Sequence, residues 1–174
     1  MARILPVEFE NADALVRNEF EDQIKKNGRV TNMKRTLLHS LPSFHALMEW
    51  YPLRDELLKF TGEREFDIFA YAISKENDCL VCSTFFRKIL IDSGDDPDDL
   101  NLSKREKVLI DFGSQCVNGA NGVDDELFSR LKNFFSDAQI VALTAFAGLM
   151  IATNLINNVL RVDLDEYLIS YAKR

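Results

Sequence analysis

The sequence predicts an all-α protein folded as a single helical domain over residues 1–174. Apolar residues recur at helical spacing along most of the chain, whereas the alternating runs typical of strands are scarce. Two capping-box sequences, which begin at Ser103 and Ser136, each precede an apolar helical pattern. With 174 residues, of which 47% are hydrophobic, the chain can bury a core without disulfides or structural metals.

Residue types that start and stop helices place the elements along the chain. Pro42 suits a first helical turn, Gly62 separates two helical patterns, and Gly94 follows a helix end. The predicted helices span about residues 11–26, 32–39, 43–60, 63–77, 79–92, 104–118, 124–133, 137–160 and 164–172.

The charge and cysteine content exclude several classes of protein. The chain carries 28 acidic and 21 basic residues, so we expect neither a nucleic-acid partner nor adsorption to an anionic membrane. The acidic stretch 92–99 lacks the Gly and Glu positions of an EF-hand loop and is predicted to be a solvated connector. Three cysteines are too few for a secreted disulfide scaffold, and no signal-peptide pattern follows Met1. We therefore predict a cytoplasmic protein.

The segment 137–160 is apolar enough to raise the question of a membrane span. Between Ile140 and Ala152 its one polar side chain is Thr144, and its length reaches the roughly 20 residues that a span needs. Asparagines interrupt its second half, and nothing else in the chain is typical of a membrane protein. We predict a helix buried on nearly all sides, either central in the domain or covered by a partner subunit.

The motif Cys79-Leu80-Val81-Cys82 is the feature most suggestive of chemistry. Two thiols at this spacing can meet on one helical turn and form a disulfide. Asp78 is predicted to cap the helix, which places Cys79 near the helix N-terminus, where the dipole stabilises a thiolate. A zinc site would need further ligands, which the third cysteine and the two histidines do not offer at paired spacing. The remaining alternative is a pair of buried core cysteines.

The surroundings of this motif carry a resemblance to a known family. Asp67 lies twelve residues before Cys79, on the preceding predicted helix. With the CxxC motif and Asp67, residues 37–167 resemble the carboxymuconolactone decarboxylase / alkyl hydroperoxidase D-like family, in its peroxidase-related branch. The segments 37–42, 103–112 and 124–158 also resemble segments of this family. Residues 1–36 would form an N-terminal lead and helix outside this family-like core.

The resemblance implies an oligomeric helical bundle, assembled as a dimer, trimer or hexamer, that reduces hydroperoxides through its cysteine pair. Carried over by position, Cys82 is the peroxidatic cysteine and Cys79 the resolving one. Asp67 occupies the position of the family's glutamate, and Phe86 occupies that of its relay histidine. No cofactor or metal is implied. The expected partners are a hydroperoxide or other small apolar substrate and a reductant, either a thiol protein or a small dithiol.

Other residues are candidates for supporting roles. His39, His45 and Tyr71 are the side chains that could replace the missing imidazole, although each is also consistent with a structural role. Cys116 could form mixed disulfides or be a buried spectator. Aromatic residues expected to wall an apolar cavity around the thiols, or else to fill a core or subunit interface, are Phe66, Phe69, Phe85, Phe86 and Phe112.

Two further functions compete with the peroxidase hypothesis. A non-redox enzyme akin to the lactone decarboxylases would need acid–base groups rather than two thiols, so the CxxC motif speaks against it. A non-catalytic oligomer that binds an apolar ligand is favoured by Phe86 at the histidine position. The leading prediction is a cysteine-dependent peroxidase or thiol–disulfide oxidoreductase.

Overall fold

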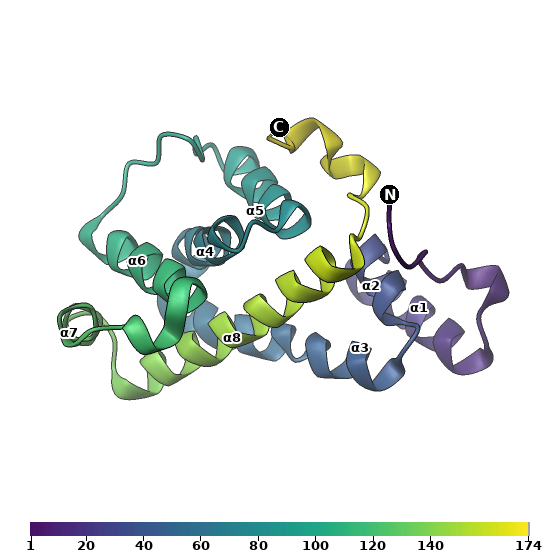
Figure 1. Ribbon diagram of the computed structural model, residues 1–174, viewed down its shortest axis with the longest axis horizontal. Helices are drawn as coiled ribbons and strands as arrows, with labels where there is room; N and C mark the ends of the chain where they lie inside the picture. The colour runs from purple at the N-terminus through teal and green to yellow at the C-terminus, as the bar shows by residue number, and fades with distance from the viewer. Residues whose placement is uncertain (174) are drawn as a thin grey trace.

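The computed structural model describes residues 1–173, and every regular element in that range is helical (Figure 1). The all-α prediction is confirmed. The α-helices are α1 (Ala14–Asn27), α2 (Asn32–Leu37), α3 (Leu41–Met48), α4 (Trp50–Glu76), α5 (Leu80–Asp92), α6 (Lys104–Gly119), α7 (Asp125–Lys132) and α8 (Asp137–Leu160). Short 3-10 helices are η1 (Phe9–Asn11), η2 (Ala120–Gly122) and η3 (Glu166–Tyr171).

The prediction of a single helix over residues 43–60 is wrong, because two helices share this stretch. α3 ends at Met48 and α4 begins at Trp50. Pro52 has no N–H to continue the hydrogen bonding of α3, and the first turn of a new helix tolerates it. α4 consists of two helical segments that meet at a kink at Gly62, whose φ of 69° and ψ of 179° are not helical, so the predicted boundary at Gly62 is confirmed. A residue with a Cβ would be strained in that conformation, so glycine sets the kink.

α8 spans Asp137–Leu160 as predicted, and it crosses the molecule against α4 (Figure 1). Its capping box is formed, with the Ser136 hydroxyl accepting from Gln139 N and the Gln139 side chain accepting from Ser136 N. By length and composition α8 could cross a membrane, but it contributes much of the core, including Phe146. Within the single chain α8 is not buried on all sides, since Val141 and Leu155 are largely exposed on one face, so the arrangement in which a partner subunit covers that face stays a prediction.

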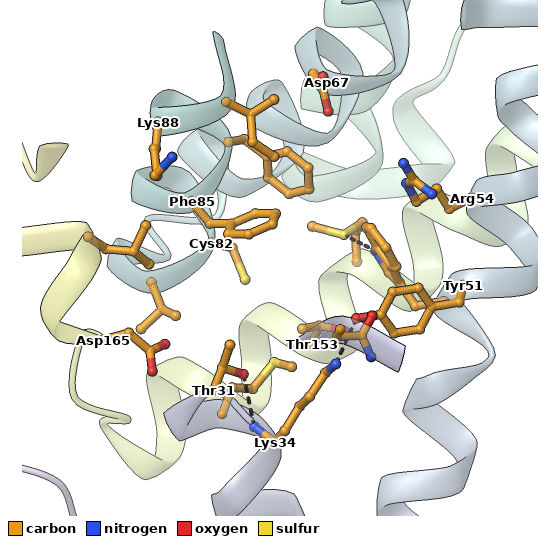
Figure 2. A pocket seen from close by; sticks show the side chains of 18 of the residues that line it. Thr31, Lys34, Tyr51, Arg54, Asp67, Cys82, Phe85, Lys88, Thr153 and Asp165 are labelled. Atoms are coloured by element: carbon orange, nitrogen blue, oxygen red, sulfur yellow. Dashed lines mark hydrogen bonds between the residues drawn. The ribbon is translucent and has the colours of Figure 1, made fainter. Parts of the chain in front are cut away.

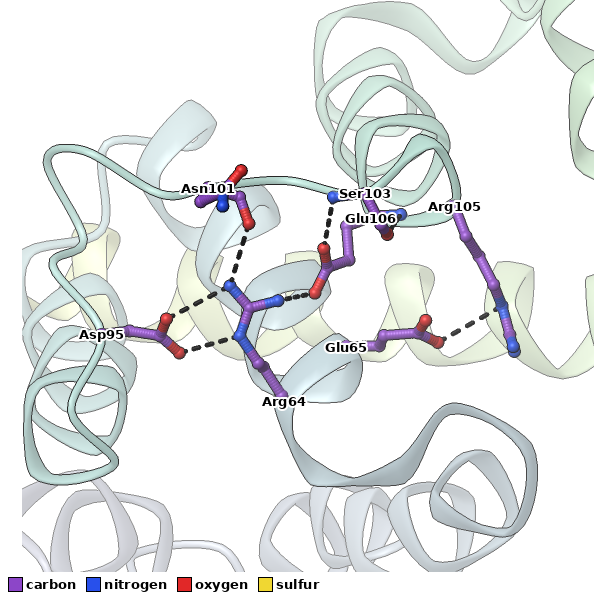
Figure 3. Close-up of polar contacts among 7 residues, drawn as sticks. All are labelled: Arg64, Glu65, Asp95, Asn101, Ser103, Arg105 and Glu106. Atoms are coloured by element: carbon purple, nitrogen blue, oxygen red, sulfur yellow. Dashed lines mark hydrogen bonds and ion pairs between the residues drawn. The ribbon is translucent and has the colours of Figure 1, made fainter.

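The connector between α5 and α6 is held to the core by Arg64 of α4 (Figure 3). The Arg64 guanidinium donates to both carboxylate oxygens of Asp95, at 3.0 and 3.2 Å, and also to the Glu106 carboxylate. Glu106 in turn accepts from Ser103 N at 2.7 Å and completes the capping box predicted for α6. The connector is largely exposed, as expected for a solvated loop, and this ion-pair cluster anchors its Asp95 to Arg64 beside the start of α6.

Two clusters of buried apolar side chains fill the fold. The larger lies among α4, α5, α6 and α8, and the smaller joins α1 to α2 and α3. The predicted C-terminal helix over 164–172 is wrong in type, since this segment forms the 3-10 helix η3. η3 packs its buried Leu168 near α5, so the C-terminal segment closes over the helix that begins at the cysteine motif (Figure 1).

Candidate functional site

The two cysteines lie where the chain turns from α4 into α5. The turn includes Asp78 at a φ of 48°, a left-handed conformation that Asp tolerates better than most residues. The prediction that Asp78 caps α5 is wrong, because Cys79 itself occupies the N-cap position. Ser83 N donates to the Cys79 carbonyl at 2.9 Å and starts the helix. Cys82 therefore lies in the first turn of α5, on the same side as Cys79.

The two sulfurs share a hydrogen bond, and both thiols are free rather than joined in a disulfide. The Cys82 thiol donates to the Cys79 sulfur, and the backbone N–H groups of Cys82 and Val81 point at the same sulfur. These donors outweigh burial and lower the pKa of Cys79 to about 7. The same bond, together with burial, raises the pKa of Cys82 well above its ordinary value. In the resting pair the Cys82 thiol keeps its proton and donates it in a hydrogen bond to the Cys79 sulfur, which is the more readily ionised of the two.

Asn157 of α8 completes the sulfur site, and the sequence analysis did not identify it. Its Nδ2 donates to Cys82 Sγ at 3.2 Å and lies 3.8 Å from Cys79 Sγ, while its side chain is almost fully buried. A neighbouring asparagine, Asn158, donates to the Asn77 carbonyl at 3.0 Å and ties α8 to the turn before Cys79. The available signal was an asparagine on an otherwise apolar helix face, which costs stability unless it is hydrogen-bonded.

A cavity of about 590 Å³ opens beside this pair (Figure 2). Cys82 is the cysteine that lines it, with its sulfur pointing into the space, whereas Cys79 is fully buried. Much of the wall is apolar, and its large apolar side chains include Met33, Trp50, Phe66, Phe85, Phe86, Ile89 and Met150. A small organic molecule in this cavity would therefore meet the sulfur of Cys82 rather than that of Cys79.

Three of the five phenylalanines expected around the thiols line the cavity, and two do not. Phe66, Phe85 and Phe86 are in its wall. Phe69 and Phe112 instead stack on each other in the core, with ring centroids 6.2 Å apart and planes 3° from parallel. These two therefore do not line the cavity; Phe69 of α4 and Phe112 of α6 pack in the core between the two helices, which matches the alternative of an aromatic core.

Asp67 lines the same cavity and is largely buried. Burial raises the pKa of its carboxyl to about 6, although Arg54 partly offsets the effect. Within residues 1–173 no hydrogen bond joins Asp67 to either cysteine, and Figure 2 draws it above the Cys82 sulfur, on the α4 side. The structure thus brings Cys79 and Cys82 into contact and places Asp67 in the wall of their cavity.

Within the described residues, none of the three candidates to replace the missing imidazole lies in the wall of the cysteine cavity. His39 is exposed and bonds the Leu5 carbonyl at 2.9 Å, while His45 is exposed and pairs with Glu19 at 2.7 Å. Tyr71 is a core residue outside the cavity wall. Phe86 itself is almost fully buried beside Phe66 and Phe85.

Cys116 lies half-buried on α6, where burial raises the pKa of its thiol. Residues 1–173 contain no group of three His, Cys, Asp or Glu side chains that could hold a metal ion. The sulfur chemistry of the described site therefore rests on the CxxC pair.

Comparison with known proteins identifies the fold. No protein-family model matches the chain, and no curated protein matches it. A solved peroxidase-related protein from Ralstonia eutropha JMP134, described as an alkylhydroperoxidase AhpD core, superposes with a TM-score of 0.76. Its identity is 18%, over 96% of this chain and 94% of that chain. The chain has the alkylhydroperoxidase D fold.

Two further structures with this fold extend the comparison. A peroxidase-related protein from Silicibacter sp. TM1040 has a TM-score of 0.73 at 17% identity, covering 94% of this chain and 93% of that chain. The debrominase Bmp8 has a TM-score of 0.78 at 14% identity, covering 97% of this chain and 95% of that chain. The resemblance to the alkyl hydroperoxidase D-like proteins is thus confirmed at the level of the fold.

Proposed function

We propose that this protein is a thiol peroxidase, or thiol–disulfide oxidoreductase, that reduces organic hydroperoxides through Cys82 and Cys79. One observation carries the proposal: the Cys82 sulfur lines an apolar cavity while its thiol proton is hydrogen-bonded to a Cys79 sulfur of lowered pKa. The alkylhydroperoxidase D fold, and the peroxidase-related proteins that share it, support this choice.

The Cys79 thiolate takes the place of the missing imidazole as the base. It accepts the proton of Cys82 along the existing hydrogen bond, which leaves a Cys82 thiolate facing the cavity. The Asn157 amide then donates to this new thiolate at the short distance already present. A thiolate is the reactive form of cysteine, so this proton transfer prepares the nucleophile.

The oxidation then proceeds in two steps. The Cys82 thiolate attacks the outer oxygen of the hydroperoxide, the O–O bond breaks, and the alkoxide leaves and takes a proton from water. Cys82 is now a sulfenic acid. The Cys79 thiol attacks its sulfur, which forms the Cys79–Cys82 disulfide and releases water. We assign Asp67 the role of accepting a hydrogen bond from the hydroperoxide O–H, since its carboxylate lies in the cavity wall.

A second candidate function is reductive dehalogenation of a small aromatic compound. The debrominase Bmp8 shares the fold, and a variant of it was solved in complex with 2,3,4-tribromopyrrole. The aromatic wall of the present cavity favours such a ligand. The same two thiols would supply both electrons, becoming a disulfide as the carbon–halogen bond is replaced by carbon–hydrogen and halide is released.

The proposed function also implies a reductant, a cellular compartment and an oligomeric state. We expect a thiol reductant protein or a small dithiol to restore the pair, and a reducing cytoplasm to keep it reduced. We also propose a homo-oligomer, because α8 carries an exposed apolar face that includes Val141, Leu155 and Val159. The acidic net charge of −7 is consistent with the expected absence of nucleic-acid and membrane partners.

Turnover of cumene hydroperoxide by the full chain, with dithiothreitol as reductant, tests the function. We expect the rate to rise with pH through about 7, because the Cys79 thiolate must be present to accept the proton of Cys82. It should level off near pH 8. Matched reactions with tribromopyrrole distinguish the second candidate by release of bromide. Turnover of neither compound would favour the non-redox or ligand-binding alternatives.

Asn157→Leu should slow oxidation of the pair by about 10- to 100-fold, because a hydrogen bond to a charged group is worth roughly 1.5–3 kcal/mol. The measurement is the stopped-flow rate of thiol loss after a hydroperoxide pulse. Asn154→Leu is the matched control: it removes a buried amide one turn earlier on α8 that has no hydrogen-bond partner within residues 1–173. Equal rates for both variants would contradict the role given to Asn157.

A further inference from the structure

The cavity has a second polar region, built by elements far from the cysteines in sequence. Lys34 of α2 is only 5% exposed, yet its side chain lines the cavity. Its Nζ donates to Gln23 Oε1 of α1 at 2.6 Å and to Tyr51 Oη of α4 at 2.7 Å. Figure 2 shows the Lys34–Tyr51 bond on the other side of the Cys82 sulfur from Asp67.

This ammonium is buried without a counter-charge. Both hydrogen bonds that it makes within residues 1–173 go to uncharged oxygens. Burial lowers the pKa of Lys34 to about 8, so the group still carries its charge at pH 7. A buried charge without a partner costs stability, so an anionic ligand that supplies the partner would gain binding free energy here.

The geometry leaves two donors free for an anionic oxygen. An ammonium has three N–H groups, and the two bonds of Lys34 use two of them. Tyr51 accepts from Lys34, and its own O–H donates to no other group in the described chain. Burial raises the pKa of Tyr51, which keeps this hydroxyl protonated. A third N–H and a phenol O–H can therefore meet one acidic oxygen.

The other cations along the wall have partners of their own. The nearest to Tyr51, Arg54, pairs with the Asp55 carboxylate at 3.2 Å. Lys88 pairs with Asp92, and the Arg29 guanidinium lies over the Tyr167 ring at 4.2 Å. Asp165 accepts from Asn32 N at 2.9 Å. Lys34 is thus a buried cation of the cavity wall whose described partners carry no charge.

We infer that Lys34 and Tyr51 form a binding site for the acidic oxygen of an apolar organic acid, a carboxylate or a phenolate. The apolar body of this molecule would lie against Trp50, Phe66 and Phe86, which presents its other end to Cys82. The inference names the substrate class of the proposed function and rests on that function for the reaction. The binding itself requires no sulfur chemistry, so the two can fail separately.

Redox-inert acids and their neutral analogues test this site. The probes are 4-phenylbutyrate against its methyl ester, and pentafluorophenol, which is ionised at pH 7, against pentafluoroanisole. Trp50 is the single tryptophan of the sequence and lines the cavity, so its fluorescence reports binding to the reduced full chain. Calorimetry provides the independent affinity. We expect at least one acid to bind about tenfold more tightly than its analogue, or more.

Variants locate the effect on the two donors. Lys34→Met should remove the preference for the acid over its neutral analogue, and Tyr51→Phe should reduce this preference about three- to tenfold. Neither variant should change the affinity for the neutral analogue. Lys59→Met is the matched control, because Lys59 pairs with Glu56 at the surface outside the cavity. Lys34→Met should also keep or raise the melting temperature, since Met fills a similar volume without a buried charge.

The binding results distinguish the two classes of acid and can overturn the proposed site. A preference for 4-phenylbutyrate alone assigns a carboxylate, and a preference for pentafluorophenol alone assigns a phenolate. Equal affinities for acids and analogues, or an acid preference that survives in Tyr51→Phe and Lys34→Met, would overturn the inference. If Lys34→Met fails to fold, Tyr51→Phe decides alone. Acid binding without hydroperoxide or halogen turnover would sink the proposed function and leave the binding site standing.

Discussion

Cys82→Ser should abolish hydroperoxide turnover, with a loss of at least about 10³-fold against the wild-type chain. Cys82 is the thiol that lines the cavity, and a serine hydroxyl at this position is a far weaker nucleophile. The Cys79 thiolate does not compensate, since its side chain is fully buried. The measurement is consumption of cumene hydroperoxide with dithiothreitol as reductant.

The control for this variant is Cys116→Ser, which removes the third thiol of the sequence. Cys116 lies half-buried on α6 and outside the cavity wall, so its loss should leave turnover unchanged. Turnover that survives in Cys82→Ser, or that disappears in Cys116→Ser, would assign the chemistry to a different group.

Cys79→Ser should slow even the first oxidation of Cys82, by about 10²-fold at pH 7. A cysteine that only resolves the sulfenic acid would leave this first step untouched. In the proposed mechanism Cys79 is also the base, and loss of a general base costs typically 10²- to 10⁴-fold. The measurement is the rate at which Cys82 loses its free thiol after a hydroperoxide pulse, to a disulfide in the wild type and to a dimedone-trapped sulfenic acid in the variant.

The pH profile separates these two roles of Cys79. In the wild type the rate should level off near pH 8, because the thiolate of Cys79 is then fully formed. In Cys79→Ser the rate should keep rising above pH 9, as Cys82 must ionise alone in a buried site. A first step of wild-type rate in this variant would show that Cys79 only resolves the intermediate.

The fold was largely predictable because its signals are local. The capping boxes at Ser103 and Ser136 and the apolar pattern of α8 depend on residues within a few turns, and all three predictions are confirmed. The division between α3 and α4 was not predicted, because the apolar pattern of residues 43–60 runs across the helix end at Met48 without interruption.

The site was predictable only where one segment of chain supplies it. The CxxC spacing placed both sulfurs on one turn, and the structure hydrogen-bonds them. Asn157 was missed because its contact spans 75 residues of sequence and depends on how α8 crosses α5. Lys34 was missed for the same reason, since its partner Tyr51 and the cavity exist only after α2 and α4 pack together.

The redox pair can be tested by intact mass measurement and peptide mapping of the reduced chain, before and after addition of one equivalent of cumene hydroperoxide. We expect a rapid loss of two hydrogens, mapped to a Cys79–Cys82 disulfide and reversed by dithiothreitol, with Cys116 still reduced. Oxidation no faster than that of a free thiol, or a disulfide that involves Cys116, would contradict the redox pair.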